Sequence, residues 1–539
     1  MKKYIYIISL ALIAISCNDF LEKNPDQRAT LDELGKIKEF LVSAYPVIGY
    51  QFTEFSSDNV TDLGLNYVAD YPEITVMQRQ LYQWETPDLL EWIDNPNDYW
   101  YACYSAIAYA NYALKAINEL VQKEQKTESS VAPVRAEALM CRAYAHFMLV
   151  NLYGEHYAPD TADKDLGIPI IYQSAEYSGV KYTRNTVKEV YDFIEKDIEE
   201  AFPNITNSTY LRPKWHFNRA AAATFASRFY LYRGLPSDWD KVIHYANQAL
   251  GSKPASLMRD LIASRAESDY TQQAINFSLS ELPCNFLLIS TVSYNGFFGN
   301  AGRYSMNTPL YTEKISGFVH PTVNTVATGR YLWRPMLGYG ISYPNKLVNK
   351  YHQYFRLSDI NSNEGWPYVM YVVFSAEEAL LNMIEAYAMK KEFGNAVEGL
   401  NSYYSRRLAN YNATVDIITE KSVEDRYKNN MTTLAPHYSL TEKQIAFIQC
   451  ALVLRNAEFM YEGLRWFDIK RMHLRIEHEV YDGETLILGA KDPKRVYELP
   501  SNALSDGIIG NFNPETDGSD ISKPPVLHYR WDKGYIEIE

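Results

Sequence analysis

Apolar residues recur at helical spacing through much of the chain, and this periodicity constrains the fold more than any other sequence feature. It predicts helices near residues 98–121, 133–154 and 186–203. Thr186 and Glu189 form a capping-box pattern at the start of the third helix, because each side chain can bond the other residue's backbone N–H. The sequence therefore predicts a mainly α fold.

Two segments resemble one another as pairs of helices joined at a glycine. In the first, residues 220–233 precede Gly234 and a second helix runs to Leu250. In the second, residues 376–393 precede Gly394, and the helical pattern then continues. Two helices joined by a glycine turn, with small residues where they cross, are typical of tetratricopeptide-like packing. The copies are too far apart for a tandem array, so we expect tetratricopeptide-like helix pairs within a larger scaffold.

The helical pattern fails between residues 251 and 349, where glycine, asparagine, proline and aromatic residues gather. A second, shorter aromatic segment covers residues 81–92. Long loops inside a domain are often functional. We therefore expect the scaffold to carry a less regular, loop-rich ligand-binding part. Because no low-complexity linker divides the chain, residues 30–539 are predicted to form a single domain with an irregular insert near 251–349.

The first residues have the pattern of an export signal. Two lysines precede an apolar run over residues 4–15, and Ser16 stands directly before Cys17. The run is too short for a typical membrane-spanning helix and lies where a secretory signal has its apolar region. We predict a lipoprotein signal peptide over residues 1–16 and a lipidated N-terminal tether over 17–29, with Cys17 as the lipidation site. The alternative is a plain signal peptide followed by an incidental cysteine.

Charge and cysteine content narrow the class of protein further. The formal net charge of −14 argues against nucleic acid as a partner, because phosphate binding needs clustered lysine and arginine. The sequence contains no CxxC or HExxH motif, so neither a transition metal nor a cofactor is expected. The aspartates over residues 160–165 could wrap a calcium ion, with an ordinary solvated loop as the alternative. Buried unpaired thiols are expected for the three cysteines in helical patterns: Cys103, Cys141 and Cys450.

The sharpest local signal is the segment 455–471, which reads Arg-Asn-Ala-Glu-Phe-Met-Tyr-Glu-Gly-Leu-Arg-Trp-Phe-Asp-Ile-Lys-Arg. On one helix its charged residues would alternate in sign along a single stripe: Arg455, Glu458, Glu462 and Arg465. A glycosidase needs two carboxylates that face each other across a cleft. Carboxylates interleaved with arginines are more typical of a structural ion-pair network, so we interpret the stripe as scaffold.

The same segment closely resembles the C-terminal signature of the SusD-like (RagB/SusD) family of outer-membrane nutrient-binding lipoproteins, E-R-x-x-E-F-x-x-E-G-x-R-W-F-D-L-x-R. Other segments that agree with the family are 17–21, 135–144, 152–169, 185–191 and 222–250. The resemblance implies a helical fold on tetratricopeptide-like pairs. It also implies a protein that works as a lid on a SusC-like TonB-dependent transporter, anchored in the outer membrane and facing the cell exterior.

The resemblance further implies capture of a nutrient, most often an oligosaccharide, for polysaccharide utilization. The aromatic content of 14%, with 45 tyrosines, suits such a ligand, because sugar rings lie flat on aromatic faces while their hydroxyls take hydrogen bonds. We expect the site where residues 293–340 meet residues 79–95. The candidate ligand-binding residues are Arg79, Trp84, Trp92, Asn95, Tyr294, Phe297, Arg303, Tyr304, Trp333, Arg334 and Tyr339.

Other functions remain as alternatives. A peptide ligand would bind through backbone hydrogen bonds instead of ring stacking. A surface glycosidase belongs to a different class, but no sequence feature supplies its paired acids, so we expect a binding protein and not an enzyme. A purely structural partner of the transporter is a third possibility.

Overall fold

The computed structural model describes residues 31–64, 72–87, 93–173, 182–293, 302–316, 319–323, 325–330, 350–359, 364–428, 434–481 and 483–512, together with the backbone of 527–530 and 535–538. The expected signal peptide and the whole of the expected tether, including Cys17, lie outside the described residues. Their roles therefore stay predictions.

The fold is mainly helical, as predicted. Its helices in the N-terminal half are α2 (Leu34–Phe40), α3 (Pro72–Tyr82), α4 (Pro96–Gln122), α5 (Glu128–Tyr153), α6 (Val187–Ala201), α7 (Arg219–Arg233), α8 (Asp238–Leu250), α9 (Pro254–Leu257) and α10 (Leu261–Ala266). The later helices are α11 (Tyr270–Phe277), α12 (Thr308–Tyr311), α13 (Thr325–Thr328), α14 (Ala376–Met389), α15 (Phe393–Tyr404), α16 (Glu420–Tyr427), α17 (Glu442–Glu458), α18 (Arg465–Arg471) and α19 (Ser501–Ser505).

Short antiparallel sheets accompany the helices. The strands are β1 (Thr61–Asp62), β2 (Asn285–Val292), β3 (Tyr304–Ser305), β4 (Tyr354–Asp359), β5 (Glu364–Ser375), β6 (Ile476–Glu479), β7 (Thr485–Leu488), β8 (Leu527–Arg530) and β9 (Tyr535–Ile538). A three-stranded sheet has the order β2-β5-β4, and β1 pairs with β3, β6 with β7 and β8 with β9. The segment that was expected to be irregular, near 251–349, thus contributes short helices and the strands β2 and β3 in its described part.

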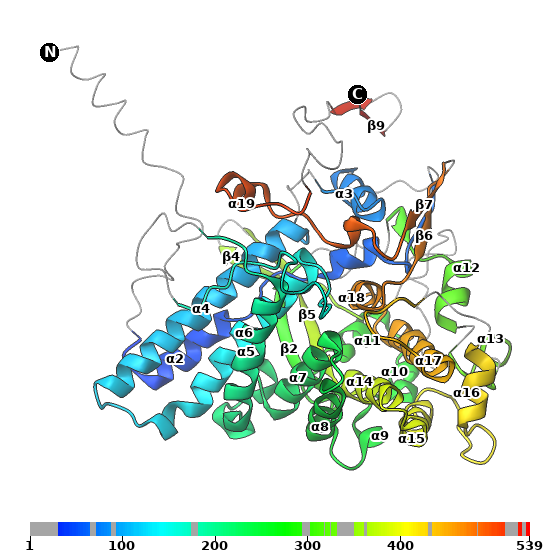
Figure 1. Ribbon diagram of the computed structural model, residues 1–539, viewed down its shortest axis with the longest axis horizontal. Coiled ribbons are helices and arrows are strands. Elements are labelled where there is room, and N and C mark those ends of the chain that lie inside the picture. The colour runs from blue at the N-terminus through cyan, green and yellow to red at the C-terminus, as the bar shows by residue number, and fades with distance from the viewer. Residues whose placement is uncertain are drawn as a thin grey trace.

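The helices and the three-stranded sheet occupy different parts of the molecule. Helices α4 to α8 and α14 to α17 follow one another along the lower side of Figure 1, and β2 and β5 stand among them. The short elements α3, α19 and the β6–β7 hairpin lie on the upper side. Buried apolar side chains from the helices, β2 and β5 form one continuous core. We therefore propose that residues 30–539 are a single domain.

Local signals position several helices correctly. Asn95 caps α4 by accepting a hydrogen bond from the backbone N–H of Asp98, and Pro96 opens the helix. Thr186 and Glu189 form the predicted capping box of α6. Helix α5 begins earlier than expected, at Glu128, so that Pro133 lies inside it.

The two predicted helix pairs exist, and they lie side by side because α14 contacts both α7 and α8. Gly234 ends α7 in the left-handed region with φ 65°. The prediction that the second pair breaks at Gly394 is wrong, since the turn lies around Lys391, which has φ 62°, and Gly394 is part of α15. The glycine needed for close packing is Gly399, where a Cβ would come within 2.6 Å of Ile384 Cγ1.

The predicted charged stripe is not one helix. Helix α17 ends at Glu458 and α18 begins at Arg465, because Tyr461 and Gly463 adopt left-handed φ angles of 62° and 79° between them. Each member nevertheless makes an ion pair, in three cases with a partner from outside the segment 455–471. The pairs are Arg455–Asp468 at 2.9 Å, Glu458–Arg407 at 2.7 Å, Glu462–Lys350 at 2.6 Å and Arg465–Asp58 at 2.7 Å. The ion-pair interpretation is confirmed and its geometry is corrected.

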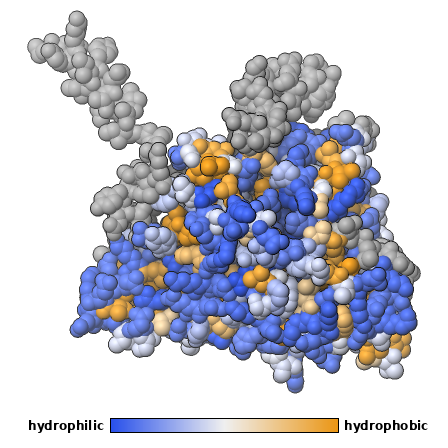
Figure 2. Space-filling view, in the orientation of Figure 1, coloured by the Kyte–Doolittle hydropathy of each residue, from blue (hydrophilic) through white to orange (hydrophobic). Residues whose placement is uncertain are grey.

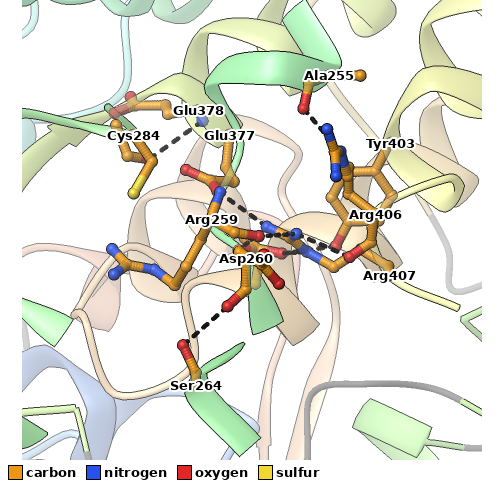
Figure 3. Close-up of polar contacts among 12 residues, drawn as sticks. Ala255, Arg259, Asp260, Ser264, Cys284, Glu377, Glu378, Tyr403, Arg406 and Arg407 are labelled. Carbon is orange, nitrogen blue, oxygen red and sulfur yellow. Dashed lines mark hydrogen bonds and ion pairs between the residues drawn. The ribbon is translucent and has the colours of Figure 1, made fainter. Parts of the chain in front are cut away.

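Arg407 links these pairs to the first turn of α14. Its guanidinium also donates to Glu377 at 2.9 Å, and the same carboxylate accepts the backbone N–H of Arg259 at 2.6 Å (Figure 3). Burial acts to raise the pKa of Glu458, but Arg407 outweighs it and the net pKa is lowered. Glu458 is therefore charged at neutral pH, and the network joins α14, α15 and α17 in the core.

The described cysteines are buried, and the described helical surface is mostly hydrophilic (Figure 2). Cys103, Cys141, Cys284 and Cys450 are buried and unpaired, as expected for the three in helices. Within the described part of the chain, no helix combines the length and the apolar character needed to cross a membrane. In the view of Figure 2, hydrophilic side chains cover most of the helical lower part, and apolar patches are scattered among them.

Candidate ligand-binding site

Segments far apart in the sequence meet on the upper side of the molecule. Strand β1 pairs with β3 so that Asp62 lies opposite Tyr304. The ring of Tyr82, at the end of α3, lies 5.0 Å from the ring of Tyr304. Ser293, at the end of β2, donates a hydrogen bond to the Asp94 carboxylate at 3.0 Å. Residues from 79–95 and 293–305 therefore meet, as the sequence led us to expect. We call residues 61–64, 79–87, 93–95 and 302–305 the junction.

A column of four rings fills the base of the junction. The order is Trp84, His478, Tyr82 and Tyr304, with centroid distances of 4.4 Å, 4.1 Å and 5.0 Å between successive rings. His478 comes from β6, and its two ring nitrogens lie 2.6 Å and 2.9 Å from the carbonyl oxygens of Tyr82 and Ser57. We call these four residues the aromatic column. It joins the β6–β7 hairpin to the junction.

Trp84 is held in a strained backbone conformation. Its φ of 55° is in the left-handed region, which a bulky residue rarely adopts. The indole N–H donates to the carbonyl of Ser56 at 2.9 Å, and the residue is only 8% exposed. The pocket that it lines has a volume of about 20 Å³, which is room for one water molecule. In this conformation Trp84 shapes the base of the junction and does not offer an open face.

Two further candidates are buried as well. Tyr304 is 1% exposed within the aromatic column, and Asn95 is fully buried as the cap of α4. Both therefore hold the junction together in this conformation. Burial lowers the pKa of His478 to about 4, so its imidazole is neutral at neutral pH and adds no charge beside them.

Two arginine side chains, Arg303 and Arg79, remain partly exposed at the edge of the junction, which we call the rim. Arg303 makes a bidentate ion pair with Asp62, at 2.5 Å and 2.7 Å, and keeps part of its side chain exposed. Arg79 donates to Gln83 at 2.9 Å and is also partly exposed. Guanidinium groups at a rim offer planar arrays of hydrogen-bond donors.

Tyr481 completes this rim, and the sequence reasoning missed it. It is 39% exposed, and its backbone N–H donates to Asp62 at 3.2 Å, beside Arg303. Its ring lies over Gly64, which has φ 84°, and a Cβ at Gly64 would overlap that ring. Tyr481 lies in the turn between β6 and β7, and nothing local in the sequence shows that this turn folds back on residues 61–64.

Six of the candidates lie outside the described residues: Trp92, Tyr294, Phe297, Trp333, Arg334 and Tyr339. Their roles stay predictions. The described residues contain no group of three or more histidine, cysteine, aspartate or glutamate side chains placed to hold a metal ion.

Comparisons with known proteins agree on one family. Residues 19–231 match the SusD-like family described as "Starch-binding associating with outer membrane". The curated relative "SusD-like protein P2" from Formosa agariphila is 24% identical over 524 residues, which cover 93% of this chain and 96% of the relative.

Solved structures extend the match to almost the whole chain. A SusD superfamily protein from Bacteroides thetaiotaomicron aligns with a TM-score of 0.58 at 16% identity, over 89% of this chain and 100% of the other. A SusD-like carbohydrate binding protein from Bacteroides vulgatus aligns with a TM-score of 0.55 at 16% identity, over 88% and 96%. The chain therefore has the same fold as these two solved structures. Residues 19–231 and the alignment with the curated relative show, in addition, that its sequence is similar to SusD-like proteins.

Proposed function

We propose that this protein is a cell-surface glycan-binding lipoprotein that captures oligosaccharides and delivers them to a SusC-like TonB-dependent transporter in the outer membrane. The observation that carries the proposal is the rim of the junction, within a SusD-like fold. There the exposed ring of Tyr481 lies beside the Arg303–Asp62 pair, so that a flat apolar face adjoins hydrogen-bonding groups. Sugars need this combination of surfaces.

The family description and one structural relative support the same ligand class. The matched family is described as starch-binding, and the relative from Bacteroides vulgatus as carbohydrate binding. The candidates outside the described residues extend the proposed site on the same two segments, 79–95 and 293–340. Asp62, the carboxylate described at the rim, is engaged by Arg303 in a bidentate ion pair, so we propose binding without catalysis in preference to a glycosidase.

The proposed anchor is a lipid on Cys17, and the proposed partner is a barrel in the same membrane. An anchor confines both proteins to one surface, which raises their effective concentration. Cys17→Ala should then release the protein from the membrane fraction of cells that lack the transporter. Co-purification of a TonB-dependent barrel after mild detergent extraction would support the pairing, and repeated recovery of the lipoprotein alone, with the barrel expressed, would contradict it.

Binding is tested with the purified full chain in detergent. Calorimetry against maltoheptaose, cellohexaose, xylohexaose and mannohexaose would identify a cognate sugar, and a mixed hexapeptide pool tests the peptide alternative. Tyr481→Ala should weaken sugar binding about five-fold, because a ring stack contributes about 1 kcal/mol beyond burial. Tyr172→Ala is the matched control, since Tyr172 is 62% exposed in the segment between α5 and α6.

The outcomes separate the claims. A wild-type chain that binds none of these sugars contradicts glycan binding. Binding that survives in a folded Tyr481→Ala variant moves the site away from the described rim, and Trp333→Ala then tests the segment outside the described residues.

A further inference from the structure

The β4–β5 hairpin carries aromatic side chains on one of its faces. Because side chains alternate along a strand, Tyr354 and Arg356 on β4 share a face with their cross-strand partners on β5. The register places Tyr354 opposite Tyr368 and Arg356 opposite Trp366. We call these four residues the hairpin face.

The side chains of the hairpin face pack against one another and hold each other in place. Tyr354 and Tyr368 stack with their centroids 5.2 Å apart and their planes 22° apart. The guanidinium of Arg356 lies 5.1 Å from the centre of the Tyr368 ring, and the ring of His352 stands at 90° to Tyr354, 4.5 Å away. A ligand would therefore meet a prearranged surface, which lowers the entropic cost of binding.

Trp366 extends this surface into solvent. It is 54% exposed, which is unusual for the largest aromatic side chain. Trp366 and Tyr368 are two residues apart on one strand, so their Cα atoms are about 7 Å apart and their side chains leave the same face. Flat rings in a row, with a guanidinium beside them, offer stacking faces and hydrogen-bond donors together.

The opposite face of the same hairpin has different chemistry. Phe355 and Leu357 are 57% and 44% exposed there, and the Phe355 ring lies over Gly365, where a Cβ would come within 2.8 Å of Phe355 Cε1. This side is apolar and has no guanidinium among its described residues. A substitution on this side therefore serves as the control for a substitution on the hairpin face.

From this geometry we propose that the hairpin face is a second sugar-binding surface, which holds a glycan chain on Trp366, Tyr368 and Tyr354. The inference rests on the proposed function and adds a second point of attachment to it.

In Figure 1, β4 lies left of centre and the β6–β7 hairpin, whose turn carries Tyr481, lies at the upper right. Strand β5 runs back to the edge of the junction, because Tyr368 pairs with Val292 and the Pro367 carbonyl accepts the N–H of Ser293. A second sugar contact on the hairpin face favours long polymers over short oligosaccharides, because it is made within the same complex.

The test compares a polymer with a short sugar, using the full chain in detergent. Electrophoresis through gels that contain soluble starch, xylan, cellulose ether or mannan measures retention by polymers, and calorimetry with the matching oligosaccharide measures binding at the junction. Trp366→Ala should reduce retention by the cognate polymer about five-fold or more, while the affinity for the oligosaccharide changes less than about two-fold. Phe355→Ala, on the opposite face, should leave both unchanged.

Each other outcome overturns a stated claim. If Trp366→Ala folds with an unchanged melting curve and is retained like the parent, the hairpin face binds no glycan. If Trp366→Ala and Phe355→Ala leave retention unchanged but both lose a co-purifying barrel, the hairpin is a protein-docking surface and the inference is wrong. If the parent chain binds no polymer and no oligosaccharide, the proposed function fails and takes this inference with it.

Discussion

The buried Glu462 carboxyl should make the protein less stable as the pH rises toward 7. Burial raises its pKa from 4.5 to about 7, although Lys350 donates to it at 2.6 Å and acts in the opposite direction. Between these two pH values the folded chain keeps the proton on Glu462 and the unfolded chain releases it. Raising the pH therefore favours the unfolded state, so this contribution to stability is fully present below pH 4.5 and is lost by about pH 7.

The size of the effect follows from the two pKa values. Each unit of difference is worth about 1.4 kcal/mol, so the free energy of unfolding should lose about 3 kcal/mol from this group across the window. Glu462→Gln keeps the shape and an oxygen acceptor for Lys350 but cannot titrate. The difference in unfolding free energy between parent and variant should therefore change by about 3 kcal/mol between pH 4.5 and pH 7.5, in favour of the glutamine at high pH.

Urea unfolding followed by tryptophan fluorescence, at half-unit steps of pH, measures this difference. Because groups far from Glu462 titrate alike in both proteins, they cancel when the two curves are subtracted. The control is Glu442→Gln at the first, solvent-exposed turn of α17, which should run parallel to the parent. Parallel curves for parent and Glu462→Gln would refute the reasoning, since Glu462 would then titrate alike in the folded and unfolded chains.

Three further predictions concern the backbone and the thiols. Gly463→Ala should lower the unfolding free energy by about 2 kcal/mol or more, because φ is 79° and the new Cβ would lie 2.7 Å from Tyr50 Cδ2; an unchanged urea midpoint would contradict it. Lys391→Gly should raise stability by about 0.5–1 kcal/mol, since Lys391 is exposed with φ 62° and loses no packing; a lower midpoint would show that its side chain matters. Burial raises the pKa of the four core thiols, so a thiol reagent should modify them only after denaturant is added: Cys103, Cys141, Cys284 and Cys450.

The helices were predictable where their signals are local. The Asn95 cap, Pro96 and the Thr186–Glu189 capping box all act within one turn of chain, so the sequence contains the whole signal. The turn at Lys391 was missed because a lysine adopts the conformation that usually marks a glycine. The strands β2 and β5 were missed because short, buried apolar runs lack a period that separates strand from helix.

For the candidate site, the sequence predicted which segments meet but not which of their aromatic rings are exposed. Aromatic residues in irregular stretches indicate that 79–95 and 293–340 are unusual, and the structure brings their described parts together. Whether a ring is buried or open depends on distant partners. His478 covers Trp84 and Tyr82, and neither residue shares a local pattern with it. The outward face of Trp366 likewise depends on the pairing of β4 with β5.

The C-terminal signature segment, residues 455–471, belongs to the scaffold and also positions the junction. The backbone N–H of Gly463 donates to Glu54 at 2.8 Å, and Arg465 pairs with Asp58 at 2.7 Å. Residues 54–58 in turn hold the aromatic column, because the carbonyls of Ser56 and Ser57 bond Trp84 and His478. A chain of contacts therefore runs from the buried ion pairs to the base of the proposed sugar site. The turn between α17 and α18, which interrupts the expected helix, brings Gly463 and Arg465 into contact with residues 54–58.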